Sequence, residues 1–177
     1  MNNGLLEAKV KKIGKMHIVL GALGAILVLA SHGESVAQGT LSIGGNSAHF
    51  GVHQVNAGFV PDPKVINITS GGNLNVSTMG YGAQCRGFAT SRPDAIVNYT
   101  GGGFLRFFVQ AGGDTTLVVN DASGRWHCND DAVGTNPMVS ISNAPSGQYD
   151  VWVGSYRSGE QIRGTLNITE LRSQQPH

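Results

Sequence analysis

The 177-residue sequence has little charge: only 13% of its residues are Asp, Glu, Lys or Arg, while 40% are hydrophobic and 26 residues are glycine. So little charge excludes a charge-rich disordered chain, and it argues against a helical bundle built from Ala, Glu, Lys and Leu. No amphipathic helix of more than ten residues is evident after residue 37. Many short strands joined by glycine turns fit this composition better.

Long hydrophobic runs are also scarce, and the longest uncharged one is Ile18 to Ala30. Four lysines between residues 9 and 15 precede it, and the small residues Ser35 and Ala37 follow it. This order is typical of a secretory signal peptide, so we expect residues 1–37 to be removed after Ala37. The run is shorter than the roughly 20 residues that span a bilayer, so no stable membrane span is expected after cleavage. The predicted location is the periplasm or the medium of a bacterium.

Positive charge is scarce once this leader is set aside. The rest of the chain holds eight Lys and Arg residues against nine Asp and Glu residues. Proteins that bind nucleic acid normally carry clustered positive charge. A nucleic-acid partner is therefore not expected.

Cysteine occurs only twice, as Cys85 and Cys128. Both lie in the part expected to be exported, where the compartment permits disulfides, and no CxxC spacing suggests a metal or redox site. We therefore predict a Cys85–Cys128 disulfide.

Alternating hydrophobic and polar residues dominate the sequence from residue 58 onward. For example, Val139 and Ile141 alternate with Ser140 and Ser142, as in a strand with one buried and one wet face. Predicted strands cover residues 65–69, 105–111, 115–120, 138–143, 149–156 and 164–171. Asp121 to Gly124 predicts a tight turn, which would bring residues 125–128 back as a strand with Trp126 and Cys128 on one side.

Strands at this spacing, separated by glycine turns, predict an all-β fold: an antiparallel β-sandwich of jelly-roll type in a single domain. The sandwich is expected to span residues 58–171, followed by a tail at 172–177. Residues 38–57 are rich in glycine and less regular, and they are expected to form either an edge strand or a flexible arm.

Acidic residues gather in two connections and suggest a calcium site. Calcium prefers six to eight oxygen ligands, which loops at one end of a sandwich can supply. The candidate ligands are Asp114, Asp121, Asp130 and Asp131. The alternative is that these residues only form turns, since Asp and Asn favour turns for backbone reasons.

One face of the strand at 149–156 is a candidate ligand surface. Alternation places Asp150, Trp152 and Tyr156 on the same face, which mixes aromatic and acidic groups. The alternative is that this face packs against other parts of the protein.

Catalytic groups are not evident. His49, His53 and His127 invite a metal or triad hypothesis, but there is no GxSxG nucleophile elbow. No catalytic residue is assigned.

Several motifs together resemble the bacterial pre-peptidase C-terminal (PPC) domain. They are Gly58-Phe-Val-Pro-Asp-Pro63, Cys85-Arg-Gly-Phe88, Arg92-Pro-Asp94, Asp114-Thr-Thr-Leu-Val-Val-Asn120, Gly124-Arg-Trp-His-Cys-Asn-Asp-Asp131 and Ser146-Gly-Gln-Tyr-Asp-Val-Trp-Val-Gly-Ser-Tyr156. The resemblance covers roughly residues 58–170. It implies a jelly-roll sandwich that serves secreted peptidases as a targeting, folding or substrate-binding appendage, with calcium bound in some members. No peptidase domain is recognised in this sequence.

The expected function is an exported, non-catalytic binding or accessory module that contacts a polymer or a protein. One alternative is a secreted serine-type peptidase or hydrolase. A further alternative is a self-assembling structural protein, since edge strands can pair with other chains.

Overall fold

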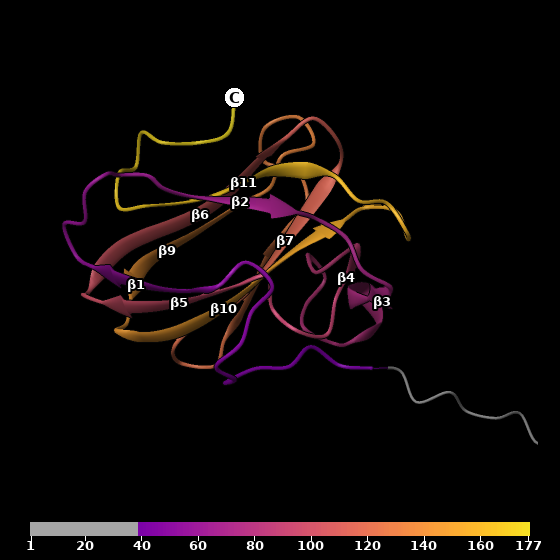
Figure 1. The fold of residues 1–177 in the computed structure, drawn as a ribbon, viewed down its shortest axis with the longest axis horizontal. Coiled ribbons are helices and arrows are strands. Elements are labelled where there is room, and N and C mark those ends of the chain that lie inside the picture. The colour runs from indigo at the N-terminus through magenta and orange to yellow at the C-terminus, as the bar shows by residue number, and fades with distance from the viewer. Residues whose placement is uncertain (1–38) are drawn as a thin grey trace, which may run out of the picture. The chain divides into compact units, whose positions relative to one another are not determined.

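The computed structural model describes residues 39–177, and within them it contains eleven β-strands, one short 3-10 helix and no α-helix (Figure 1). The predicted signal peptide lies outside the described residues. The elements are β1 (Val52–Asn56), β2 (Lys64–Thr69), β3 (Leu74–Asn75), η1 (Val76–Thr78), β4 (Phe88–Ala89), β5 (Ala95–Thr100), β6 (Gly103–Ala111), β7 (Thr115–Asn120), β8 (Trp126–Asn129), β9 (Met138–Ala144), β10 (Gly147–Ser155) and β11 (Arg163–Thr169).

The strands form two sheets. In the seven-stranded sheet, β10 pairs with three strands, β5, β7 and β4. Each of these has one further neighbour: β1 pairs with β5, β8 pairs with β7, and β3 pairs with β4. The four-stranded sheet has the order β2-β11-β6-β9. The prediction of an all-β sandwich is confirmed. Its antiparallel character holds for every pair except β1 and β5, which run parallel because the chain enters the other sheet at β2 before it returns to β5.

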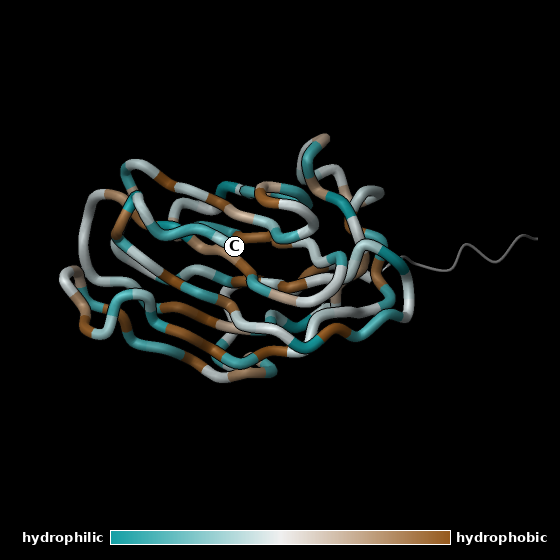
Figure 2. Tube along the Cα trace, turned by 90° about the horizontal axis from the view of Figure 1, so that it is seen from above, coloured by the Kyte–Doolittle hydropathy of each residue, from teal (hydrophilic) through white to brown (hydrophobic). Residues whose placement is uncertain are grey.

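Apolar side chains from both sheets meet in one core. Tyr149, Val151 and Val153 of β10 point into it, as do Leu105 and Phe107 of β6, and all five are fully or almost fully buried. Their spacing of two residues reflects the alternation of side chains along a strand. Figure 2 shows hydrophobic (brown) and hydrophilic (teal) segments following each other along the strands. Burial of this continuous core is the main driving force for the fold.

The outer faces of the four-stranded sheet differ from one strand to the next. On the edge strand β9, Ser140 and Ser142 are exposed as predicted. On the central strand β11, by contrast, Asn167 and Thr169 are buried although they alternate with the core residues Leu166 and Ile168. The physical reason is that β11 has a neighbouring strand on each side.

The C-terminal tail at 172–177 folds back over β6. Arg106 Nη1 donates hydrogen bonds to the carbonyls of Arg172 and Gln174, at 2.9 and 2.5 Å. Phe108, on the same face of β6 as Arg106, is only 3% exposed, and Pro176 is buried. The tail therefore belongs to the folded unit.

Residues 39–57 are held against the seven-stranded sheet. β1 lies at its edge, and Phe50 N donates to the Asp94 carbonyl at 2.7 Å just before β1 begins. Further upstream, Gly44 N donates to Asp150 Oδ2 at 2.7 Å. Of the two forms expected for this segment, the structure contains the edge strand.

A second core lies on the outer side of the seven-stranded sheet. Trp152 of β10 and Val118 of β7 are fully buried there beneath Leu41, Val76 and Cys85. The cover consists of the N-terminal segment at Leu41 and the connection from β3 to β4. This second core positions the candidate site.

Candidate binding site

The β7–β8 hairpin supplies one wall of the site. Its turn is closed by a hydrogen bond from Gly124 N to the Asp121 carbonyl, and Gly124 has a positive φ of 80°, which favours glycine. The turn returns β8 with Trp126 and Cys128 packed on the second core, as the sequence predicted.

The Cys85–Cys128 disulfide is present, so this prediction is confirmed. It ties β8 to the β3–β4 connection, which carries few strand contacts. Gly87, next to this bridge, has a φ of 82°, and a Cβ placed there would come within 2.5 Å of Thr116 Cγ2. The connection can therefore lie close to β7 only because residue 87 is glycine.

Three aromatic rings run from the surface into the second core. Tyr81 stacks on Trp126 with ring centroids 3.8 Å apart and planes 12° apart. Trp126 in turn lies 5.7 Å from Trp152, whose indole nitrogen donates to the Ser91 carbonyl at 3.2 Å. Tyr81 and Trp126 are partly exposed, whereas Trp152 is fully buried. The two outer rings therefore rest on the buried Trp152, which is itself fixed by its hydrogen bond.

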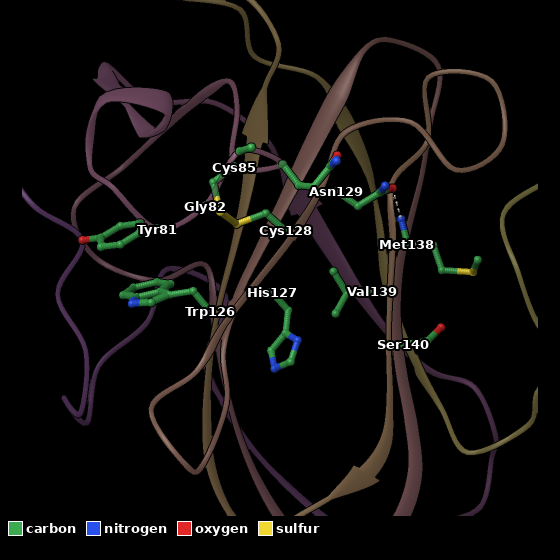
Figure 3. A pocket seen from close by; sticks show the side chains of 12 residues that line it. Tyr81, Gly82, Cys85, Trp126, His127, Cys128, Asn129, Met138, Val139 and Ser140 are labelled. Carbon is green, nitrogen blue, oxygen red and sulfur yellow. Dashed lines mark hydrogen bonds between the residues drawn. A yellow bond between two sulfur atoms is a disulfide. The ribbon is translucent and has the colours of Figure 1, made fainter.

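A cavity of about 380 Å³ opens beside this stack (Figure 3). The aromatic pair and the disulfide form one side of it, and Met138, Val139 and Ser140 of β9 form the other. Asn129 Oδ1 accepts a hydrogen bond from Met138 N at 2.9 Å and so joins the edges of the two sheets. The cavity therefore lies at the open side of the sandwich between β8 and β9.

His127 lines the cavity and is paired with Asp121. The distance from His127 Nε2 to Asp121 Oδ2 is 2.8 Å, and the Asp121 side chain is fully buried. Burial alone would raise the pKa of Asp121, but hydrogen bonds from Ser123, His127 and the backbone of Arg125 outweigh it and hold this pKa below its ordinary range. Asp121 is therefore an anion that orients His127.

Among the described residues, no nucleophile is hydrogen-bonded to this acid–imidazole pair. Ser140 is the serine that lines the same cavity, and its Oγ accepts a hydrogen bond from Arg106 Nε at 2.8 Å. Within residues 39–177, no hydroxyl or thiol forms a hydrogen bond with His127. The geometry resembles two members of a triad without the third.

The four predicted calcium ligands are not gathered at one place. Asp121 follows the last residue of β7, whereas Asp114 precedes the first. Burial raises the pKa of Asp114, as do the negative charges of Asp131 and then Asp130, so these three lie near one another. In the described part of the chain, no group of three or more His, Cys, Asp or Glu side chains is arranged to hold a metal ion.

The predicted ligand face on β10 is not open to a ligand. Trp152 is fully buried and Asp150 is only 3% exposed, because residues 39–50 and the β3–β4 connection cover this side of the sheet. Tyr156 is 42% exposed but lies beyond the end of β10. The alternative interpretation, packing, holds for Trp152 and Asp150.

Sequence reasoning missed Tyr81. Trp126 was predicted on the strand at 125–128, but Tyr81 lies in a connection without alternation, and only the fold of the disulfide loop brings it onto Trp126. The available signal was the spacing of Trp126 and Cys128, which places Trp126 on the same side of β8 as the disulfide to this loop.

The part of the chain that the structure describes has no helix long and apolar enough to cross a membrane.

Comparison with known proteins identifies one relative. The chain is 31% identical over 111 residues to the uncharacterized protein Synpcc7942_2126 of Synechococcus elongatus, a match that covers 59% of this chain and 81% of the relative. The chain belongs to the family of this protein. The Synechococcus relative is itself uncharacterized, so membership in its family assigns no activity. No family model matches the chain.

Among solved structures, the chain is similar to the pre-peptidase C-terminal domain of a collagenase from Bacillus anthracis. The TM-score is 0.39 at 15% sequence identity, with 70% of this chain and 98% of that domain covered. This neighbour carries the same domain name as the family that the sequence motifs resemble.

Proposed function

We propose that the protein is an exported, non-catalytic β-sandwich module that binds a polymer or a protein through the cavity beside Tyr81 and Trp126. The observation that carries the proposal is the anchored stack of Tyr81 on Trp126 at the rim of this cavity. Aromatic rings offer a large contact area, and rings that are already fixed lose little conformational freedom on binding. The jelly-roll connectivity implied by the PPC resemblance is part of this proposal.

Export is supported by the disulfide. Cys85 and Cys128 are the two cysteines of the chain, and both take part in the bridge. Structural disulfides persist in oxidising compartments and are rare in the cytosol. The proposed location is the periplasm or the surrounding medium.

The non-catalytic part of the proposal is supported by the incomplete arrangement around His127. The alternative, a secreted serine-type hydrolase, requires a hydroxyl that His127 can deprotonate, and Ser140 is held by Arg106 instead. In the proposed role, the Asp121–His127 pair fixes a polar group at the cavity wall for hydrogen bonding to a ligand.

Calcium remains a proposal for the Asp114 end of the molecule. Asp114 Oδ1 is buried without a hydrogen-bond partner within residues 39–177, and a nearby cation would offset the repulsion from Asp131 and Asp130. Asp121 is no part of such a site, because its carboxylate already accepts hydrogen bonds from Ser123, Arg125 and His127. Millimolar calcium should raise the melting temperature of the wild type but not that of Asp114→Asn. An unchanged wild-type midpoint removes calcium from the account.

The test of the proposed function uses four polymers in pelletable form: cellulose, chitin, peptidoglycan sacculi and gelatin coupled to beads. The purified protein should sediment with at least one of them, without releasing soluble fragments. A fluorophosphonate probe, which labels activated serines, should leave the protein unmodified. Labelling abolished by Ser140→Ala would establish the hydrolase instead. Failure to sediment with any of the four would contradict polymer binding.

Self-association is tested on the same preparation by size-exclusion chromatography. The exposed edge of β1 could pair with a second chain. Elution as a monomer would exclude this alternative, and concentration-dependent oligomers that a proline in β1 abolishes would support it.

A further inference from the structure

A second cavity, of about 410 Å³, shares no lining residue with the first. Three segments that are distant in sequence meet around it: His49 and Phe50 before β1, the chain from Thr69 at the end of β2 to Gly72, and Thr90 and Asp94 before β5. Gln161 closes one side. Asp94 is the only carboxylate among these lining residues, and none of them is lysine or arginine.

The strand pairing explains why Asp94 is buried here. Its backbone N donates to the Val151 carbonyl at 2.8 Å, and its Oδ2 accepts from Val153 N at 2.7 Å, where β10 parts from β5. The residue is only 3% exposed. Oδ1 forms no hydrogen bond within residues 39–177, and it is not among the fully enclosed polar atoms of this region. This second oxygen therefore faces the cavity.

A buried carboxylate normally has a cation beside it, because burial without one is costly. Asp94 forms no ion pair within the described residues. Burial raises its pKa to about 7, and the hydrogen bond from Val153 only partly opposes this effect. The carboxyl group thus lacks the positive partner that would let it ionise freely.

The neighbouring charged groups do not supply that partner. Arg92 Nη2 lies 2.8 Å from His49 Nδ1, and a guanidinium group can only donate, so Nδ1 carries no proton. Burial and the charge of Arg92 both lower the pKa of His49, which keeps the imidazole neutral. Arg157 pairs with Glu160 at 3.8 Å on an exposed turn next to Gln161. Both arginines are therefore engaged away from Asp94.

We propose that this cavity binds an alkylammonium group, with Asp94 Oδ1 as its counter-ion. The side-chain amide of Gln161 has no hydrogen-bond partner within residues 39–177 and offers a second acceptor. Phe50 provides an apolar wall for the aliphatic stem, and Gly71 and Gly72 line the cavity without side chains. The group could belong to a free amine or to a lysine side chain of a partner protein, since the chemistry of recognition is the same. The site does not depend on the function proposed for the first cavity.

Proton release is the signature of this site. The ammonium ion favours the ionised carboxylate, so binding lowers the pKa of Asp94 and affinity rises with pH until the carboxyl is ionised. A group with a pKa of about 7 is roughly one-tenth ionised at pH 6 and nine-tenths at pH 8. We therefore expect roughly tenfold tighter binding at pH 8 than at pH 6.

The experiment is an NMR titration of the purified protein with butylamine, observed at the Val153 amide, which donates to Asp94. Butanol is the neutral control of equal size. Butylamine should give saturable shifts with the tenfold pH dependence, and butanol should not. Equal binding of butanol, a flat pH profile or the absence of a saturable shift at Val153 would overturn the proposal.

Two variants sharpen the result. Asp94→Asn retains an oxygen for Val153 N but removes the charge, so butylamine binding should be lost. If this variant does not fold, the pH profile of butylamine binding and the butanol control, both measured on the wild type, still test the proposal. Asp131→Asn, which removes an exposed carboxylate that does not line this cavity, should bind butylamine as the wild type does.

A short lysine peptide with blocked ends distinguishes the two possible sources of the alkylammonium group. Much tighter binding of the peptide than of butylamine indicates a protein partner, and equal or weaker binding indicates a small amine.

Discussion

The ring of Tyr81 stacks on the indole of Trp126 at a centroid distance of 3.8 Å, although the β3–β4 connection and β8 are not paired directly in the sheet. The covalent connection between these segments is the Cys85–Cys128 disulfide. Below the pair, the buried Trp152 supports Trp126. The exposed aromatic surface is therefore a product of the bridge and of the second core together.

Removal of the bridge should destabilise the protein. A disulfide limits the unfolded chain, and for a separation of 43 residues the loop-closure model gives about 4 kcal/mol. The free energy of unfolding of the Cys85→Ser/Cys128→Ser double variant should fall by roughly this amount in urea titrations. The wild type under reducing conditions should match the double variant. A loss below about 1 kcal/mol would show that the loop is held by packing alone.

The close approach of the β3–β4 connection to β7 at Gly87 leads to a second prediction. In Gly87→Ala, the new Cβ would lie 2.5 Å from Thr116 Cγ2 and 2.8 Å from the Ser155 carbonyl oxygen, at a φ of 82°. Gly159 has a similar φ of 78° but open space around it, so Gly159→Ala carries the backbone strain without the clash. The control should lose about 1 kcal/mol and Gly87→Ala at least about 2 kcal/mol more. Equal losses in the melting experiment would remove the steric argument.

The strand framework could be predicted from sequence, because alternation records which side chains face the core. Val139 and Ile141 against Ser140 and Ser142 predicted β9 and its orientation. The turn at Asp121 to Gly124 predicted β8, since Asp and Gly at these positions close a hairpin for local reasons.

The sites could not be predicted in the same way, because they depend on contacts between segments without alternation. Trp152 stands on a face with Asp150 that the sequence suggested was open, yet the β3–β4 connection and residues 39–50 cover it. The two-residue strands β3 and β4 leave almost no periodic signal. The cavity around Asp94 likewise arises where three separate segments cross, and no local pattern marks it.

The raised pKa of Asp94 predicts a dependence of stability on pH. Its folded value of about 7 lies above the ordinary value of 3.8, so between these values the folded protein holds a proton that the unfolded chain has lost. The stabilising contribution is complete below pH 4 and is lost as the pH rises through 7. Asp94→Asn cannot ionise, so its stability relative to the wild type should increase over this window, by at most about 4 kcal/mol.

The measurement is urea unfolding of both proteins at pH 4, 6 and 8. Titrations shared by the two proteins cancel in the difference, which isolates residue 94. A difference that stays constant with pH would mean that Asp94 titrates normally.

The binding of polymers through the first cavity is tested most directly by two matched tyrosine substitutions. Tyr81→Ala removes the outer ring of the stack, whereas Tyr156→Ala removes a partly exposed tyrosine that does not line the cavity. Sedimentation isotherms are measured with a polymer that binds the wild type. Tyr81→Ala should bind it at least about tenfold more weakly, which corresponds to a loss of at least about 1.4 kcal/mol of binding free energy. Tyr156→Ala should bind it as tightly as the wild type does. Wild-type binding by a folded Tyr81→Ala protein, or equal losses in the two variants, would contradict the account.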